Sequence, residues 1–331
     1  FYAVRMAANQ RVNTIEQMYR MNKAKDFDEF YEALRMQAYP RYNIVYGDKD
    51  GNIMYLNNGL TPIRNEDYNW SSVLPGDTSA TLWTQFHPLE ERPQVINPKC
   101  GYVFNTNNTP FNATCKSENL NPKDYPAYYG FEVGDNNRSY RLMALLEECD
   151  LIGLEDIKKM KFDCQYPDSS TFLTSVDNFM QLNPDKFPDV AESIVKMQNW
   201  DKRADKESEA AGMFMLAYGY IFDKLNLGVE TFMEGLNVED TVYVEAIEYA
   251  NHHLMEYFKT LDVTLGQLQV HVRGDKEYGV SGFADALAAN YNMPYTNGWF
   301  RTYVAASYVQ FLQVTGVKVS VETWKPYGDS Y

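Results

Sequence analysis

Segments with the period of β-strands lie at both ends of the chain, and a long stretch with the period of α-helices separates them. The predicted helices cover residues 13–37, 136–148, 154–162, 170–181, 188–199, 208–224 and 239–260. The predicted strands cover residues 43–56, 101–105, 269–273, 300–309 and 317–322. This order predicts an α+β fold, in which one mixed sheet carries a helical insertion, rather than two independent halves.

The first β segment predicts a hairpin. Gly51 follows Asp50 near the centre of residues 43–56, and glycine supplies the positive φ that a tight turn requires. A calcium loop would need a longer run of oxygen ligands that ends in glutamate, which this segment lacks. In the helical segment before the hairpin, Asp28 is the predicted cap.

Residues 57–100 are rich in proline, glycine and asparagine and show no regular period. A long irregular segment of this kind tends to line a binding site rather than to hold a core. We therefore expect this segment to border a functional site.

The charge and the apolar runs restrict the partners of the chain. The formal net charge of −15 argues against nucleic-acid binding, which needs clustered lysine and arginine. No run reaches the ~18 apolar residues of a membrane-spanning helix. Because the chain opens on FYAVRM rather than on Met, we expect an internal fragment or a processed chain, so a missing signal peptide says nothing about location.

The four cysteines contain no CxxC pair, which disfavours a zinc site. A disulfide between Cys100 and Cys115 would close a loop worth roughly 3 kcal/mol and would imply an oxidising compartment. Buried free thiols are the alternative, and the sequence leaves both open.

The common catalytic motifs are absent from the sequence: GxGxxG, GxxxxGK[ST], GxSxG and HExxH. His87 precedes a proline and is interpreted as positional, and His252 and His253 are interpreted as a helix-face pair. The most unusual remaining feature is GYVFNTNNTP at residues 101–110, where a strand-like apolar run leads into three asparagines.

Two interpretations of Asn105, Asn107 and Asn108 are open from the residues alone. A carboxamide fixed at the end of a strand can donate to an oxygen on which negative charge develops, as in an oxyanion hole. Asparagine is also common where the chain only turns.

The chain resembles the β-subunit of the penicillin acylase family of N-terminal nucleophile hydrolases. Matching segments occur in the family's order: the hairpin with DKDGNIMY, Asn58-Gly59 with Pro62 and Arg64, Pro75-Gly76, Trp83, PLE at 88–90, PQVINP at 93–98, Gly101-Tyr102, NTNNTP at 105–110, Asn137-Arg138 and Trp200-Asp201. The resemblance covers about residues 1–165, with weaker agreement to the end.

The resemblance implies a fragment of an αββα sandwich with a helical insertion. Residues 1–135 would form part of the core, with the hairpin and an active-site loop. Residues 136–264 would form the helical segment, and residues 265–331 would return to a truncated β-rich core.

The resemblance also implies a mechanism. An N-terminal Ser attacks an amide carbonyl with its own α-amine as the base, and an acyl-enzyme forms and is hydrolysed. Asn107 matches the asparagine of the oxyanion hole. Arg138 matches the arginine near the nucleophile's amine, where a positive charge would favour the neutral, basic amine.

The chain departs from the family pattern in two respects. The nucleophile would lie upstream of Phe1, so the chain alone is expected to be inactive. Residues 125–129 lack the aspartate that binds calcium in some members, so no metal ligand is assigned, no cofactor is expected, and a structural calcium in the full-length protein lacks support.

The resemblance implies a secreted or periplasmic amide hydrolase, made from a zymogen together with an α-subunit from the same precursor. Its small-molecule N-acyl substrates would be β-lactams, acyl-homoserine lactones or lipopeptides. Two alternatives are a non-catalytic carbohydrate-binding or surface-interaction protein and a catalytically inactive family member that acts as a scaffold.

Overall fold

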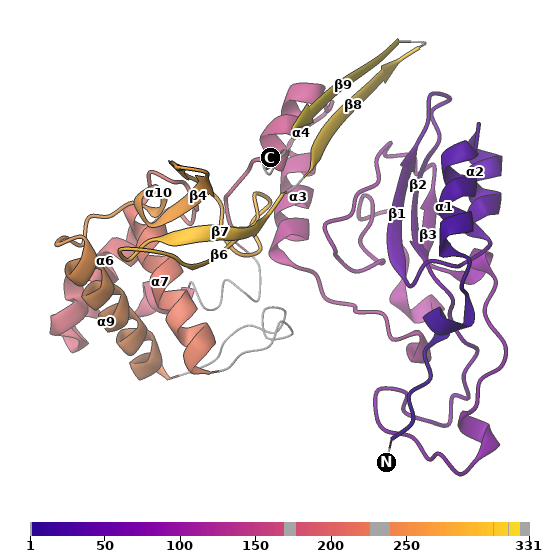
Figure 1. The fold of residues 1–331 in the computed structure, drawn as a ribbon, viewed down its shortest axis with the longest axis horizontal. Coiled ribbons are helices and arrows are strands. Elements are labelled where there is room, and N and C mark those ends of the chain that lie inside the picture. Colours follow the sequence, from indigo (N-terminus) through magenta and orange to yellow (C-terminus); the bar gives the residue numbers. More distant parts are fainter. Residues whose placement is uncertain (1, 169–176, 226–238, 307, 317, 325–331) are drawn as a thin grey trace. The chain divides into compact units, whose positions relative to one another are not determined.

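A computed structural model describes residues 2–168, 177–225, 239–306, 308–316 and 318–324 (Figure 1). They form two compact units, and each is described by itself. Within the described ranges, the first unit comprises residues 2–135 with 315–316, and the second comprises residues 136–314 with 318–324. Both units contain helices and strands, so the predicted α+β class is confirmed.

In the first unit, two helices cover one face of a three-stranded antiparallel sheet (Figure 1). In chain order these elements are α1 (Thr14–Lys23), α2 (Phe27–Leu34), β1 (Tyr42–Gly47), β2 (Ile53–Asn58) and β3 (Gln94–Ile96). Because side chains alternate along a strand, Met54 and Leu56 of the central strand pack with Leu34 of α2, while Tyr55 packs on the opposite face. The core of this unit therefore lies on both faces of β2.

The hairpin predicted for residues 43–56 is confirmed, with Gly47 paired to Ile53 at its closed end. The Oδ1 atom of Asp48 accepts hydrogen bonds from the main-chain N–H groups of Asp50 and Asn52, each at 2.9 Å. Gly51 adopts φ of 89°, which explains the glycine at this position.

The helical segment predicted over residues 13–37 is two helices, and the predicted cap is wrong. Asp26 caps α2, because its extended backbone lets Oδ1 accept from the N–H of Glu29 at 2.9 Å. Asp28 lies within the first turn of α2.

The strand predicted at residues 101–105 is also wrong. The N–H of Phe104 donates to the carbonyl of Ala113 at 2.9 Å, but no ladder of the described residues continues this contact. The chain turns at residues 105–108 before a second rung can form. The described strands also form three separate sheets, where we had expected one mixed sheet.

The second unit begins with helices close to the predicted bounds. They are α3 (Asn137–Glu147), α4 (Leu154–Lys161), α6 (Ala191–Gln198), α7 (Glu209–Lys224) and α9 (Asp240–Tyr257). The short helix α10 (Leu265–Leu268) lies where no helix is predicted. Of the helix predicted over 170–181, residues 170–176 lie outside the described residues, and 177–181 are helical. Phe214 of α7 and Ile247 of α9 are both fully buried in the main core. None of the described helices is both long enough and apolar enough to cross a bilayer.

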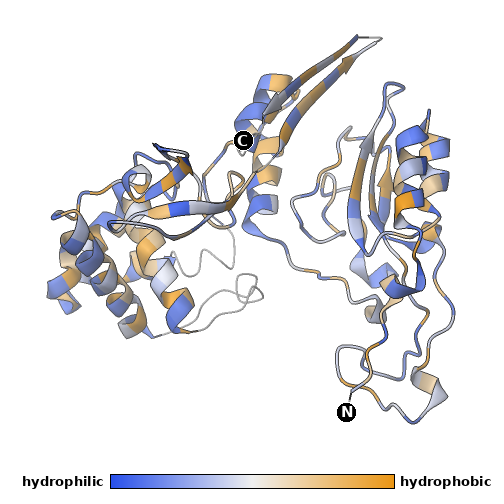
Figure 2. Ribbon diagram, in the orientation of Figure 1, coloured by the Kyte–Doolittle hydropathy of each residue, from blue (hydrophilic) through white to orange (hydrophobic). Residues whose placement is uncertain are grey.

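The strands of the second unit form a four-stranded sheet and a separate pair. They are β4 (Gln269–Arg273), β5 (Lys276–Gly279), β6 (Asn290–Pro294), β7 (Phe300–Ala305), β8 (Val309–Thr315) and β9 (Lys318–Trp324). The sheet order is β5-β4-β7-β6, with β4 and β7 parallel. Hydrophobic and hydrophilic residues alternate along β8 and β9 (Figure 2).

Short 3-10 helices punctuate the irregular segments of both units. They span Ala7–Gln10, Ser79–Thr81, Leu89–Glu91, Pro122–Asp124, Ala127–Tyr129, Pro184–Lys186 and Pro188–Val190. Residues 57–100 are otherwise irregular apart from β2 and β3.

Candidate active site

Asparagine side chains set the geometry of the loop at residues 105–108. Oδ1 of Asn105 accepts from the N–H of Asn107 at 3.2 Å. Oδ1 of Asn108 accepts from the N–H of Thr106 at 2.7 Å and from its hydroxyl at 3.1 Å. These local bonds replace a backbone turn, so Asn105 and Asn108 have the turn-forming role that the sequence left open.

Asn107 differs from its two neighbours. Its φ of 63° lies in the left-handed region, which asparagine tolerates better than most residues. Its side chain is exposed on the first unit, while Asn108 beside it is only 4% exposed. The loop therefore presents one carboxamide at the surface from a buried, hydrogen-bonded base.

A second layer of hydrogen bonds anchors this base. Nδ2 of Asn108 donates to the carbonyls of Thr109 and Asn112. The hydroxyl of Thr109 donates to the carbonyl of Glu132 at 2.6 Å, and Nδ2 of Asn112 donates to Oδ2 of Asp135 at 2.7 Å. Contacts to residues more than 20 positions away restrict the loop more than a local turn could.

Cys100, which precedes this loop, and Cys115, which follows it, form a disulfide, a pairing that the sequence left open. Cys149 and Cys164 are free thiols. The carboxylate of Glu118 accepts from the N–H groups of Lys99 and Cys100, each at 2.9 Å, and these bonds lower the pKa of Glu118. Cys100, Cys115 and Glu118 are the one close group of possible metal ligands in the described residues, but their sulfurs are bonded to each other.

Arg138 lies in the second unit, in the first turn of α3. Its Nε donates to Oδ1 of Asp285 at 2.9 Å, and Oδ2 of Asp285 accepts from the N–H of Asn137 at 2.9 Å. Burial raises the pKa of Asp285, while the charge of Arg138 opposes that rise. The two predicted site residues belong to different units, Asn107 to the first and Arg138 to the second.

The start of α3 determines where Arg138 lies. Asn136 has an extended backbone, and its Oδ1 accepts from the N–H of Ser139 at 2.9 Å, which is the geometry of an N-cap. The sequence did not identify Asp285, because it lies 147 positions away and no local pattern connects it to Arg138.

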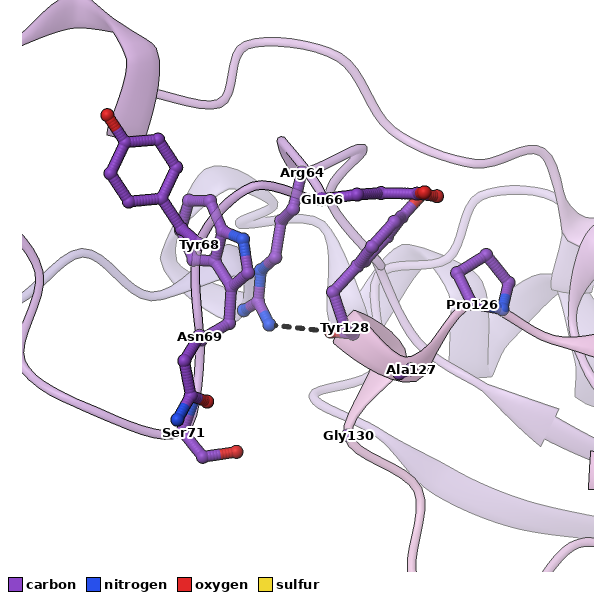
Figure 3. A pocket seen from close by; sticks show the side chains of 10 residues that line it. Arg64, Glu66, Tyr68, Asn69, Ser71, Pro126, Ala127, Tyr128 and Gly130 are labelled. Carbon is purple, nitrogen blue, oxygen red and sulfur yellow. Dashed lines mark hydrogen bonds between the residues drawn. The ribbon is translucent and has the colours of Figure 1, made fainter.

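A cavity of about 440 Å³ lies in the first unit (Figure 3). Its lining residues are Arg64, Glu66, Tyr68, Asn69, Trp70, Ser71, Pro126, Ala127, Tyr128 and Gly130. Nη1 of Arg64 donates to the carbonyl of Tyr128 at 2.9 Å, and the guanidinium lies 4.9 Å from the ring centroid of Trp70. Aromatic and charged side chains of the irregular 57–100 segment thus line this cavity together with residues of a later segment.

His87 is buried beside this cavity lining and is held at both ring nitrogens. Nδ1 lies 2.6 Å from a carboxylate oxygen of Glu91, and Nε2 lies 3.0 Å from the hydroxyl of Tyr128. Such an arrangement fixes the ring and connects the 3-10 turn at 89–91 to the turn at 127–129.

Comparisons with known proteins agree over most of the chain. The sequence model of the penicillin amidase family matches residues 2–314. A 128-residue stretch is 34% identical to Penicillin G acylase of Escherichia coli, covering 38% of this chain and 14% of that protein. A 195-residue stretch is 24% identical to Penicillin acylase 2 proenzyme of Pseudomonas sp. (strain SE83), covering 59% of this chain and 23% of that protein.

Among solved structures, a thermostable Penicillin G acylase from Alcaligenes faecalis superimposes with a TM-score of 0.57 at 14% identity. The superposition covers 95% of this chain and 63% of that one. At this identity the likeness concerns the fold, which is that of an N-terminal nucleophile hydrolase. The chain spans less than a quarter of the length of either sequence relative.

Proposed function

The chain belongs to the penicillin amidase family, and we propose that its protein hydrolyses linear or cyclic amide C–N bonds of N-acyl compounds. An N-terminal Ser outside residues 1–331 would attack the carbonyl, with its own α-amine as base, to form an acyl-enzyme. On this proposal residues 1–331 alone are inactive. The family match over residues 2–314 supports the reaction class.

The loop at residues 105–108 carries the proposal. We assign Nδ2 of Asn107 as a donor to the oxyanion of the tetrahedral intermediate, a role worth about 10²–10³ in rate. Such a donor is effective when it is fixed before the reaction, and the flanking bonds of Asn105 and Asn108 supply that rigidity. Asn107 itself is an exposed residue of the first unit.

Arg138 is assigned to the α-amine of the nucleophile, whose neutral form its charge would favour. The ion pair with Asp285 restricts the guanidinium to one orientation and offsets part of its charge. Arg138 would therefore bias the amine moderately rather than act as an isolated cation.

The substrate classes we propose are β-lactams, acyl-homoserine lactones and lipopeptides, which would place the protein in antibiotic metabolism or in quorum quenching. The cavity lined by Arg64, Tyr68 and Tyr128 is a candidate for contact with the leaving group. Its aromatic rings and its cation suit a flat or anionic group.

We further propose that the protein is a zymogen, cleaved into an α-subunit and a β-subunit that contains this chain. The proenzyme name of the Pseudomonas relative supports that order of events. The disulfide between Cys100 and Cys115 supports the periplasm or the cell exterior as its location, because disulfides persist in oxidising compartments.

A second candidate is carbohydrate binding without catalysis. The cavity at residues 64–71 favours it, because Tyr68, Asn69 and Trp70 offer the rings and polar groups that sugars contact. Glycan binding that persists in an Asn107→Ala variant, by a protein whose wild type shows no hydrolysis, would support this candidate.

The test uses the full-length gene, with the sequence upstream of Phe1 included. Asn107→Ala should lower kcat for chromogenic N-acyl anilides by about 10²–10³, or roughly 3 kcal/mol. Because alanine is strained at a φ of 63°, the variant should also lose about 1 kcal/mol of stability while it stays folded. Asn121→Ala is the matched control, since Asn121 is also an exposed asparagine in the first unit. Equal kcat values in the two variants would refute the role of Asn107.

A further inference from the structure

Three arginines of the first unit line one small cavity of about 170 Å³. They are Arg41, Arg64 and Arg92, and they come from three separate segments of the chain. Their grouping is unexpected in a chain with a net charge of −15.

The aromatic residues beside the cavity show how close the cations are. The guanidinium carbons of Arg41 and Arg92 lie 5.0 Å and 5.1 Å from the ring centroid of Phe131. Arg92 also lies 6.0 Å from the ring centroid of Tyr129, which lines the cavity. Two like charges beside one ring repel each other, and an anion that contacts both would offset this repulsion.

Arg92 is the most buried of the three, with 2% of its surface exposed. Nε donates to the carbonyl of Asn57 at 3.0 Å, and Nη2 donates to the carboxamide oxygen of the same residue. Both acceptors are neutral. A buried cation usually has an ionised partner, so this guanidinium has charge left to satisfy.

Arg64 shows the same deficit. Nη1 donates to the carbonyl of Tyr128, but its buried Nε finds no hydrogen-bond partner among the described residues. Burial lowers the pKa of Arg64, and it lowers the pKa of Arg92 to about 10; the nearby charge of Arg41 adds to both shifts.

Within the part of the chain that the structure describes, no carboxylate lies within ion-pair distance of these three arginines. Arg35 in the same unit differs, because it pairs with both Glu32 and Glu90. The first unit therefore neutralises an exposed arginine while it leaves the three around the cavity without an acid.

The backbone holds Arg41 at the cavity by a close approach that only glycine permits. A Cβ atom on Gly59 would lie 2.7 Å from Cα of Arg41, and Gly59 adopts φ of 140°. Nη2 of Arg41 also donates to the carbonyl of Gly130 at 3.1 Å. Close packing against Gly59 thus restricts the backbone of the exposed Arg41, and the bond to Gly130 restricts its side chain beside the cavity.

We propose that Arg41, Arg64 and Arg92 form a binding site for one small oxyanion of the carboxylate or phosphate class. The planar fork of a guanidinium matches both groups in two-point hydrogen bonds. A cavity of about 170 Å³ admits a small anion and excludes drug-sized ligands, which fill ~300 Å³ or more. The site is independent of the acyl-transfer role assigned to Asn107.

The experiment is calorimetric titration of the purified full-length protein with inorganic phosphate and, separately, with succinate. We expect saturable binding of at least one anion, and the stronger of the two identifies the class. Arg41→Gln and Arg64→Gln should each weaken binding at least tenfold. Arg20→Gln is the matched control and should bind like the wild type, since Arg20 is exposed and pairs with Glu16.

Three results would overturn the proposal. The first is the absence of saturable binding, and the second is equal affinities in Arg41→Gln and Arg20→Gln. The third is a lower melting temperature in Arg41→Gln and Arg64→Gln without any effect of added anion on the wild type, which would mean that a carboxylate of the protein itself occupies the site.

Discussion

Asn108→Ala should test whether the hydrogen bonds of Asn108 hold the loop that carries the candidate oxyanion donor, Asn107. The side chain is 4% exposed, and its Oδ1 accepts from the N–H and the hydroxyl of Thr106. Its Nδ2 donates to the carbonyls of Thr109 and Asn112. Oδ1 also accepts from Nδ2 of Asn105 at 3.4 Å, so alanine removes five bonds. The buried carbonyl of Asn112 loses this donor, while the carbonyl of Thr109 keeps the N–H of Asn112.

The magnitude follows from these bonds. Each contributes about 0.5–1.5 kcal/mol net, and a buried carbonyl left without a donor costs about 1–3 kcal/mol. Water can reach the exposed side of the loop and restore part of that loss. We therefore expect the free energy of unfolding to fall by about 2–4 kcal/mol, and kcat to fall at least tenfold if Asn107 acts as proposed.

Denaturant titration of the full-length protein measures the first quantity, and hydrogen exchange at residues 104–113 shows whether the loss is local. Asn121→Ala is the control, because Asn121 is exposed and its side chain accepts one bond, from the N–H of Lys123 at 3.1 Å. The reasoning is refuted if Asn108→Ala unfolds within about 0.5 kcal/mol of that control and shows unchanged exchange in the loop.

Two further predictions concern the disulfide and the ion pair of α3. Replacing Cys100 and Cys115 by serine should lower the free energy of unfolding by about 3 kcal/mol, because a loop of 15 residues reopens in the unfolded chain; equal denaturation midpoints would contradict this. Arg138→Leu leaves Asp285 buried without its cation and should cost about 2–4 kcal/mol at pH 7. Burial raises the folded-state pKa of Asp285, so stability from this group is greatest below its unfolded pKa and is lost as pH rises through the folded one. The deficit of the variant should therefore shrink between pH 7 and pH 4 in denaturant titrations, and a constant deficit would exclude this cause.

Much of the fold could be predicted from local pattern. The hairpin at residues 43–56 and the helices α3, α4, α7 and α9 lie near their predicted bounds, because an amphipathic period and a turn glycine are local properties. The strand predicted at residues 101–105 is wrong because a strand needs a neighbouring strand to pair with. The chain turns after Asn105, and no ladder forms there among the described strands.

The candidate site divides in the same way. The asparagine cluster stood out in the sequence, and the family resemblance assigned roles to Asn107 and Arg138. The residues alone could not show which asparagines form the turn and which one is exposed, because that depends on which side-chain oxygen accepts from which N–H group. The residues alone also could not show whether Cys100 and Cys115 form a disulfide or stay free thiols, because a separation of 15 residues is compatible with either state.

The sequence by itself determined the α+β class, the first hairpin, the order of the longer helices and the family to which the chain belongs. Only the tertiary structure decided that Arg138 faces Asp285, which is 147 positions away, and that three arginines from separate segments surround one cavity. Local periodicity records which face of an element is apolar, whereas the pairing of charges depends on which distant segments the packed core brings together.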